Sequence, residues 1–171
     1  KFEQQAGIDE FGGVVNPGYA GRALVSLWMG LHPQPVRFSL AYGELDIAPE
    51  EVGFPGVSLF DGSAFHLASD ALGELRSGQQ LIAIHSGENP QTDRLSAALG
   101  NALYGAVLGW TERQMEVVRN YRQMGSQQGV ADKLEVEQST VSRSLQAASY
   151  GRIEGGLQVF QDEVDHILSE R

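Results

Sequence analysis

The sequence predicts an α+β domain followed by an all-α domain that contains a helix-turn-helix. Strand-like and helix-like hydrophobic patterns alternate up to residue 88, and only helical patterns follow. A hairpin followed by alternating strands and helices is typical of a sheet with helices packed on one face. We therefore expect two domains, residues 1–88 and 89–171, in a chain of 171 residues.

The first domain contains three segments with strand-like patterns. Apolar residues around glycines and acids favour a hairpin at 2–15. Strict alternation of apolar residues predicts a strand at 37–45, and a short apolar run predicts a buried strand at 81–84. Residues 48–57, rich in proline, glycine and acid, are expected to form a loop.

Three longer segments show helical periodicity. Helices are expected at 18–31, after Asn16-Pro17 as a start signal, at 62–75 and at 91–110. The predicted apolar residues of the first helix are Tyr19, Leu24, Leu27, Trp28 and Leu31. The predicted apolar stripe of the second helix is Phe65, Leu67, Ala68, Ala71, Leu72 and Leu75, and that of the third is Leu95, Leu99, Leu103, Val107 and Trp110. The third helix also carries Gly100, Gly105 and Gly109, which indicate either a packing seam with a second copy or a connector lying on its own domain.

The helix-turn-helix is predicted from the apolar spacing in the second domain. Helices are expected at about 111–124, 127–134 and 138–148, with Thr111 as a cap and Gly125 as a stop. The first helix should bury Met115, Val118, Tyr121 and Met124, and the next two should bury Val130, Ala131, Leu134, Val136, Val141 and Leu145. Glu135 falls in the turn, where a left-handed conformation should cost about 1 kcal/mol.

The third of these helices has the composition of a DNA-recognition helix. The predicted DNA-binding residues are Gln127, Gln128, Glu137, Gln138, Ser139, Thr140, Ser142, Arg143 and Gln146. Arg143 is expected on a phosphate or a guanine, whereas Glu137 would either accept from cytosine or repel phosphate. The alternative is that the unit serves protein–protein contact or plain helical packing.

The net charge of −10 opposes nucleic-acid binding, but the charge is unevenly spread. Residues 111–152 carry six basic and five acidic side chains, a net +1. There is no cysteine, and the four histidines lie far apart, so we expect no metal site built from thiolates or histidine pairs. No leader or long apolar run is evident, which indicates a cytoplasmic protein, and the start at Lys1 suggests that an N-terminal piece is missing.

Three stretches of the chain resemble the SatD family of bacterial proteins. They are Gly109-Trp110-Thr111-Glu112-Arg113-Gln114, the helix-turn-helix with Gln138-Ser139-Thr140-Val141-Ser142-Arg143-Ser144-Leu145, and Asp61-Gly62-Ser63-Ala64-Phe65-His66. The resemblance implies a ferredoxin-like, nucleotidyl-cyclase-like sandwich, here N-terminally incomplete, followed by a DNA-binding unit.

The resemblance also suggests a place for cyclase chemistry. Asp9-Glu10-Phe11 falls where the family has Gly-Asp-Glu-Phe, with Ile8 in place of the glycine. Asp9 and Glu10 are thus weak candidate metal ligands, but the second carboxylate that two-metal chemistry needs would precede this chain. We therefore expect no enzyme activity and no cofactor, and Asp61 is expected to cap a helix.

The C-terminal segment at 153–168 is predicted to be a packing helix. Its apolar residues Ile153, Leu157, Phe160, Val164 and Ile167 form a seam, against either the helix-turn-helix or a second copy. The sequence thus favours a cytoplasmic, homodimeric transcription regulator that binds double-stranded DNA, with no membrane partner. The alternative is a nucleotide-binding or vestigial cyclase-like protein with a protein-interaction tail.

Overall fold

The protein is a mixed α+β, mostly helical chain, as the sequence predicts. The computed structural model describes residues 2–4, 11–45 and 62–169. In order, its elements are β1 Phe2–Gln4, β2 Phe11–Gly13, the 3-10 helix η1 Pro17–Tyr19, α1 Ala20–Leu31, β3 Phe38–Ala41, α2 Ser63–Ser77, β4 Ile82–His85, α3 Pro90–Leu108, α4 Glu112–Met124, α5 Gln127–Leu134, α6 Gln138–Ala147 and α7 Tyr150–Ser169.

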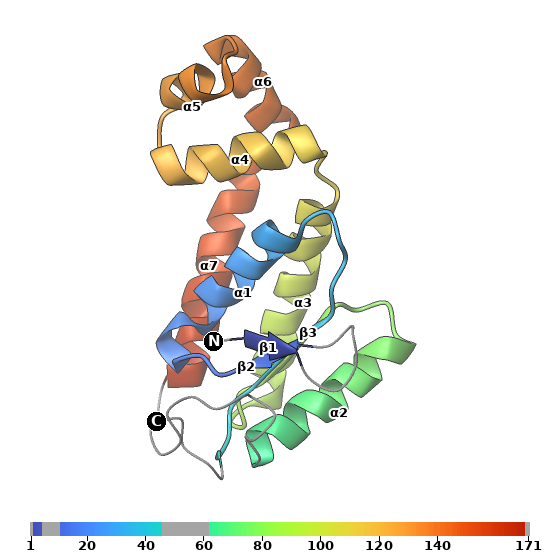
Figure 1. Ribbon diagram of the computed structural model, residues 1–171. Helices are drawn as coiled ribbons and strands as arrows, with labels where there is room; N and C mark the ends of the chain where they lie inside the picture. The colour runs from blue at the N-terminus through green and yellow to red at the C-terminus, as the bar shows by residue number, and fades with distance from the viewer. Residues whose placement is uncertain (1, 5–10, 46–61, 170–171) are drawn as a thin grey trace.

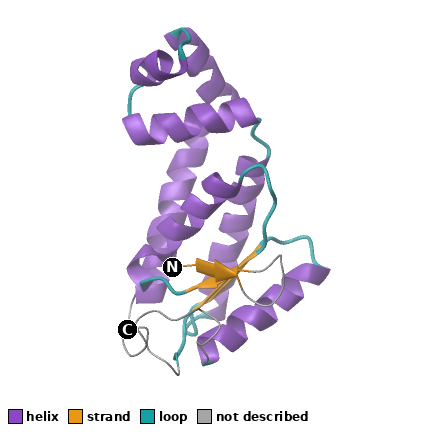
Figure 2. Ribbon diagram, in the orientation of Figure 1, coloured by secondary structure: helices purple, strands orange, loops and turns teal. Residues whose placement is uncertain are grey.

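The helix-turn-helix and the strands lie at opposite ends of the molecule (Figure 1). Helices α4, α5 and α6 form one end, and the strands with α2 form the other (Figure 2). The long helix α7 runs between the two ends, packed against α1, α3 and α6. Here the strands, α1, α2, α3 and most of α7 are called the body, and α4–α6 the helical unit.

The strands described by the structure form two separate pairs. β1 and β2 are antiparallel, which confirms the predicted hairpin, and β3 pairs with β4 in parallel, with Phe38 opposite Ile82. The strand predicted at 37–45 covers only Phe38–Ala41, because only this stretch lies alongside β4. The ferredoxin-like sandwich stays a prediction, and the loop expected at 48–57 lies outside the described residues.

Aromatic stacking and close helix contacts hold the centre of the body. The fully buried Trp28 of α1 stacks on Tyr104 of α3 and Phe160 of α7, with ring centroids 5.0 and 5.2 Å away. A Cβ on Gly100 would lie 2.8 Å from the Phe160 ring, so α3 and α7 meet within one chain at this glycine. A Cβ on Gly105 would meet nothing within 4 Å, so this glycine lines no intramolecular seam.

Four residues from the predicted apolar sets are exposed. Tyr19, Leu67, Leu95 and Met124 have exposed fractions of 58%, 40%, 64% and 43%. α3 instead buries Ser96, Gly100, Leu103, Tyr104 and Val107, a face turned slightly from the predicted stripe. Tyr104 was not included in the predicted apolar stripe. Its ring stacks on Trp28, so the face of α3 that carries Tyr104 is the one packed toward α1.

One cluster of buried apolar residues extends through both ends of the part described. It runs from Trp28 and Phe38 in the body through Trp110 to Val130 and Val141 in the helical unit. The boundary expected between residues 88 and 89 falls in the turn before α3, which packs on β4. The division into two domains stays a prediction.

Candidate nucleic-acid interface

Local signals set both ends of α4. The Thr111 side chain accepts a hydrogen bond from the Gln114 backbone N–H, while the Gln114 side chain accepts from the Thr111 N–H at 2.8 Å. This reciprocal capping box satisfies two backbone donors that a helix start leaves unpaired. Gly125 ends the helix in the left-handed conformation, with φ 66°. The observed Glu112–Met124 therefore confirms the predicted helix.

The turn between α5 and α6 has the conformation expected from the sequence. Ser126 caps the start of α5, and Glu135 ends it in the left-handed region at φ 53° and ψ 46°. The Val136 N–H donates to the Ala131 carbonyl at 3.0 Å across this turn. The tight turn requires a positive φ at this position. Glu135 has a Cβ, so it should pay the steric cost of about 1 kcal/mol that glycine would avoid.

Helix α6 is buried on one face only. Val141 and Leu145 pack inward with Val130 and Ala131 of α5, all below 9% exposure, as predicted. On the other face Gln138, Ser139, Arg143 and Gln146 are exposed, whereas Thr140 and Ser142 are half-buried. The outward polar face that base readout requires is therefore present on α6.

The remaining predicted interface residues flank this face. Gln128 and Glu137 are exposed and Gln127 is half-buried. The Gln138 amide donates to the Gln127 Oε1 at 2.6 Å, which links the start of α6 to the start of α5. Together with α6, these residues form what we call the α6 face: Gln127, Gln128, Glu137, Gln138, Ser139, Thr140, Ser142, Arg143 and Gln146.

Arg143 is held over its own helix without an acidic partner among the described residues. Its Nε donates to the Ser139 carbonyl at 3.3 Å, and its Nη2 to the Thr140 hydroxyl at 3.4 Å. Both contacts are long and exposed, so they can be exchanged for a phosphate or a guanine at little cost. The nearby carboxylate of Glu137 accepts from the Ser139 hydroxyl at 3.3 Å.

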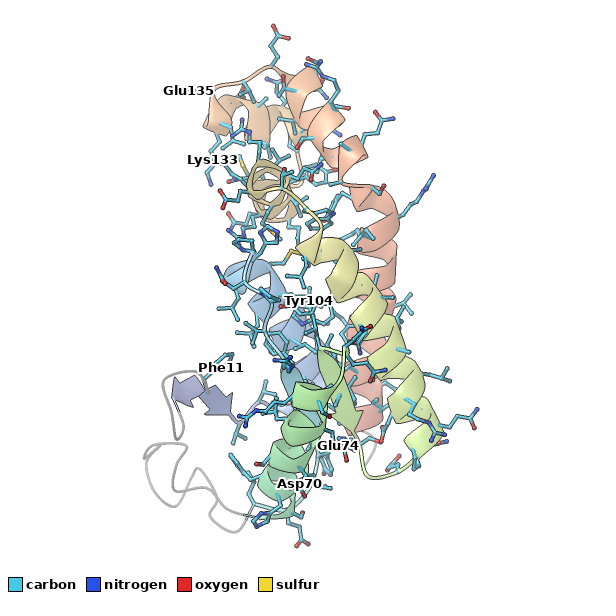
Figure 3. The ribbon with its side chains drawn as sticks, turned by 90° about the vertical axis from the view of Figure 1, so that its right-hand side faces the viewer. Phe11, Asp70, Glu74, Tyr104, Lys133 and Glu135 are labelled. Atoms are coloured by element: carbon cyan, nitrogen blue, oxygen red, sulfur yellow. The ribbon has the colours of Figure 1, made fainter. Side chains whose placement is uncertain are left out.

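The structure shows that three arginines of α4 have structural partners, which the sequence did not indicate. Arg119 donates through Nε at 2.8 Å, and through Nη2, to the Met29 carbonyl of α1. Arg122 pairs with Glu154 of α7, and Arg113 with Glu116 one turn away, each at 2.5 Å. Among the described residues of the helical unit, Lys133 and Arg143 are therefore the basic side chains left exposed without an acidic partner, beside Asp132, Glu135 and Glu137. Lys133 and Glu135 appear at the end of the unit in Figure 3.

The junction between the helical unit and the body is formed by contacts that the sequence patterns did not indicate. The Trp110 indole donates to the Ala148 carbonyl at 2.9 Å, and the Trp110 carbonyl accepts from His32 Nε2 at 2.9 Å. Tyr150, the first residue of α7, packs edge-on against the rings of Trp110 and Tyr121. The cap at Thr111 predicted where α4 starts, and the seam predicted at 153–168 allowed contact of α7 with the helix-turn-helix, but no pattern indicated that α7 would pack mainly on α1 and α3 or that α1 would reach this junction.

Buried tyrosines lie at this junction and in the body. Burial raises the pKa of the Tyr150 hydroxyl, and its hydrogen bond with Glu154 and the charge of that carboxylate raise it further. Burial likewise raises the pKa of Tyr104, whose hydroxyl accepts from the Val36 N–H at 3.0 Å. Both side chains therefore resist ionisation in the folded protein.

The candidate metal ligands Asp9 and Glu10 lie outside the described residues, and so does Asp61. Gly62, not a side-chain cap, takes the position before α2, and His66 is exposed on that helix. Within the described residues no group of three histidine or acidic side chains is placed to hold a metal ion. The expectation that the protein has no cyclase-like activity stays a prediction.

Comparison with known proteins gives no relative. No family model, no curated protein and no solved structure matches this chain. Among the described helices, none has the length and apolar character needed to cross a lipid bilayer.

Proposed function

We propose that the protein is a cytoplasmic transcription regulator whose helix α6 enters the major groove of double-stranded DNA. The observation that carries the proposal is the one-sided burial of α6: Val141 and Leu145 are buried, and Ser139 and Arg143 are exposed on the opposite face. A second helix joined to the first by a three-residue turn, with polar groups facing outward, suits groove recognition. An α6 face packed under neighbouring elements would have excluded this function.

Each part of the α6 face has a distinct role in this proposal. Arg143 bonds a phosphate or a guanine, and the amides of Gln138 and Gln146 can pair with adenine edges. Ser139, Thr140 and Ser142 donate to phosphates or bases. Glu137 stands at the start of α6, where it accepts from cytosine or weakens binding to phosphate.

The few cations on the helical unit lead to two expectations. Phosphate contacts set the salt dependence of binding, so one copy with Lys133 and Arg143 should bind weakly and with a shallow salt dependence. Since one such unit also covers only a few base pairs, we propose a homodimer that reads two half-sites. Sedimentation at the concentrations used for DNA binding tests this, and a monomer on a single half-site would contradict it.

The experiment compares Arg143→Ala with Arg113→Ala. A binding selection from random duplexes, repeated at several salt concentrations, first supplies the DNA. Arg143→Ala should then weaken binding by about 1–3 kcal/mol with an unchanged melting temperature. Arg113→Ala removes another exposed arginine, which pairs with Glu116 away from the α6 face, and it should leave binding unchanged.

Three outcomes would contradict the proposal. They are a selection that enriches no sequence, equal binding by both variants, and a large loss of thermal stability in Arg143→Ala. The last would show that Arg143 supports the fold rather than the DNA contact.

A further inference from the structure

A large cavity lies in the body, away from the helical unit. Its volume is about 640 Å³, and it is lined by residues of β2, α1, β3, α2 and the end of α7. Its apolar wall includes Leu24, Leu27, Phe38, Leu40, Phe65 and Leu72. Small-molecule sites in proteins have volumes of about 300–1,000 Å³ and walls of this kind. The cavity is therefore large enough for a small organic molecule.

The charge of the cavity wall is opposite to that of the protein. The chain has 22 acidic and 12 basic residues, yet the described lining includes Arg37 and Arg76 and no acid. The exposed acids Asp70 and Glu74 of α2, labelled in Figure 3, are not part of the lining. Such a wall favours an anion over a neutral or cationic guest.

Arg37 is positioned to hold an anionic group. Its Nε donates to the Leu75 carbonyl at the end of α2, at 3.0 Å, which fixes the side chain beside the cavity. No acid is paired with it among the described residues. Its terminal guanidinium nitrogens can therefore form the charge-assisted, paired hydrogen bonds that a carboxylate accepts.

The open edge of β3 offers further donors. Phe38 and Tyr42 donate their backbone N–H groups toward β4, to the carbonyls of Leu81 and His85. The alternate residues Ser39 and Ala41 line the cavity, and their N–H groups face away from β4. The Ser39 hydroxyl is buried and has no hydrogen-bond partner among the described residues, an arrangement that costs free energy.

We propose that this cavity binds a small carboxylate with an apolar body, such as an aryl or medium-chain acid. The apolar body lies among Leu24, Leu27 and Phe65, and the carboxylate is held by Arg37 beside the edge of β3. The cavity wall is coupled to the helical unit, because α1 also carries Met29, the acceptor for Arg119 of α4. Binding of the guest is independent of the proposed DNA-binding function. Only the inference that the guest controls DNA binding rests on that function.

The test uses two fluorescent probes with the same aromatic rings. Anilinonaphthalene sulfonate is an anion, and phenylnaphthylamine lacks the charged group; both are titrated into the full chain. The first should bind more tightly than the second. Arg37→Gln should weaken binding of the anion about tenfold, the effect of one lost charge-assisted contact, and leave binding of the neutral probe unchanged.

Two further variants make the result specific to the cavity. Ala68→Phe places a larger side chain in the cavity and should weaken the binding of both probes. Ala23→Leu on α1 serves as a second filling variant if the first does not fold. Arg94→Gln removes an exposed arginine of α3 outside the lining and should change neither. Decanoate should displace the anionic probe, and decanol should not.

Equal binding of the anionic probe to wild type, Arg37→Gln and the filling variants would overturn the proposal, as would its failure to bind the wild type. The duplex selected above is then titrated with and without decanoate. Anion binding without any duplex binding would overturn only the DNA-binding function. If the protein binds decanoate but its affinity for the duplex is the same with and without decanoate, only the proposed control of DNA binding by the guest would be overturned.

Discussion

The helical unit and the body differ in the range of the contacts that define their elements. In the helical unit, α4 and α5 start at the side-chain caps Thr111 and Ser126, and α4 ends at the left-handed Gly125. In the body, Asn89 caps α3, but α1 and α2 start without a side-chain cap, as α6 does in the helical unit. Their positions depend on partners far along the chain, such as Phe160 beneath Trp28. Local capping can be predicted from a few adjacent residues, whereas long-range packing cannot.

The largest effect is expected from Trp28→Ala, which removes the centre of the body. Trp28 is fully buried between Tyr104 and Phe160, so the substitution should lower the free energy of unfolding by about 3–5 kcal/mol. Urea titration followed by circular dichroism measures the loss.

The same variant tests whether the two regions unfold together. The chain has two tryptophans, so Trp110 at the junction becomes the sole source of tryptophan emission. Because the buried apolar residues form one cluster, fluorescence and circular dichroism should give coincident transitions. A fluorescence transition at higher urea would show that the helical unit survives without the body.

A smaller loss is expected where α1 meets the backbone of α7. A Cβ on Gly21 would lie 2.6 Å from the Gln161 carbonyl oxygen and 2.8 Å from its Cα, so Gly21→Ala should cost about 1–3 kcal/mol. The control is Gly105→Ala in α3, where a Cβ meets nothing within 4 Å and should stabilise the helix by roughly 0.5–1 kcal/mol. Thermal denaturation of both variants should give shifts of opposite sign, and equal shifts would contradict the close approach of α1 to α7.

Alkaline pH should destabilise both regions through their buried tyrosines. Burial raises the pKa of Tyr104 and Tyr150 in the folded state. The free energy of unfolding is therefore unaffected below the unfolded-state pKa of about 10, and it falls as the pH rises from there toward the folded-state pKa, because only the unfolded tyrosines ionise in that range. The loss should reach about 1.4 kcal/mol per pH unit for each tyrosine that stays protonated. Urea unfolding at pH about 8 and about 11 measures it, and Tyr150→Phe should reduce the pH dependence. A variant with the full pH dependence would show that Tyr150 ionises freely.

The sequence predicted the helical unit more closely than the body for these physical reasons. The helices from Glu112 to Ala147 end within one residue of the predicted bounds, because Thr111, Gly125 and Ser126 act on adjacent backbone groups. Leu95 and Leu67 were wrongly placed in the core, since periodicity alone cannot tell which of two adjacent helix faces meets a partner. The polar face of α6 was predictable from spacing, but the structural roles of Arg119 and Arg122 depend on Met29 and Glu154, which no local pattern connects to them.

The smallest effect concerns the turn before α6, where local sequence and local geometry disagree. Glu135 has φ 53°, which glycine adopts without a steric penalty, so Glu135→Gly should raise the free energy of unfolding by about 1 kcal/mol. The control Gln123→Gly lies in the last turn of α4 with ordinary helical geometry and should lower it by roughly 0.5–1 kcal/mol. Urea unfolding distinguishes the two, and a loss in both variants would place the strain elsewhere. A gain at Glu135 with unchanged DNA binding would show that this acid serves neither the turn nor the groove, which separates the stability of the helical unit from its recognition.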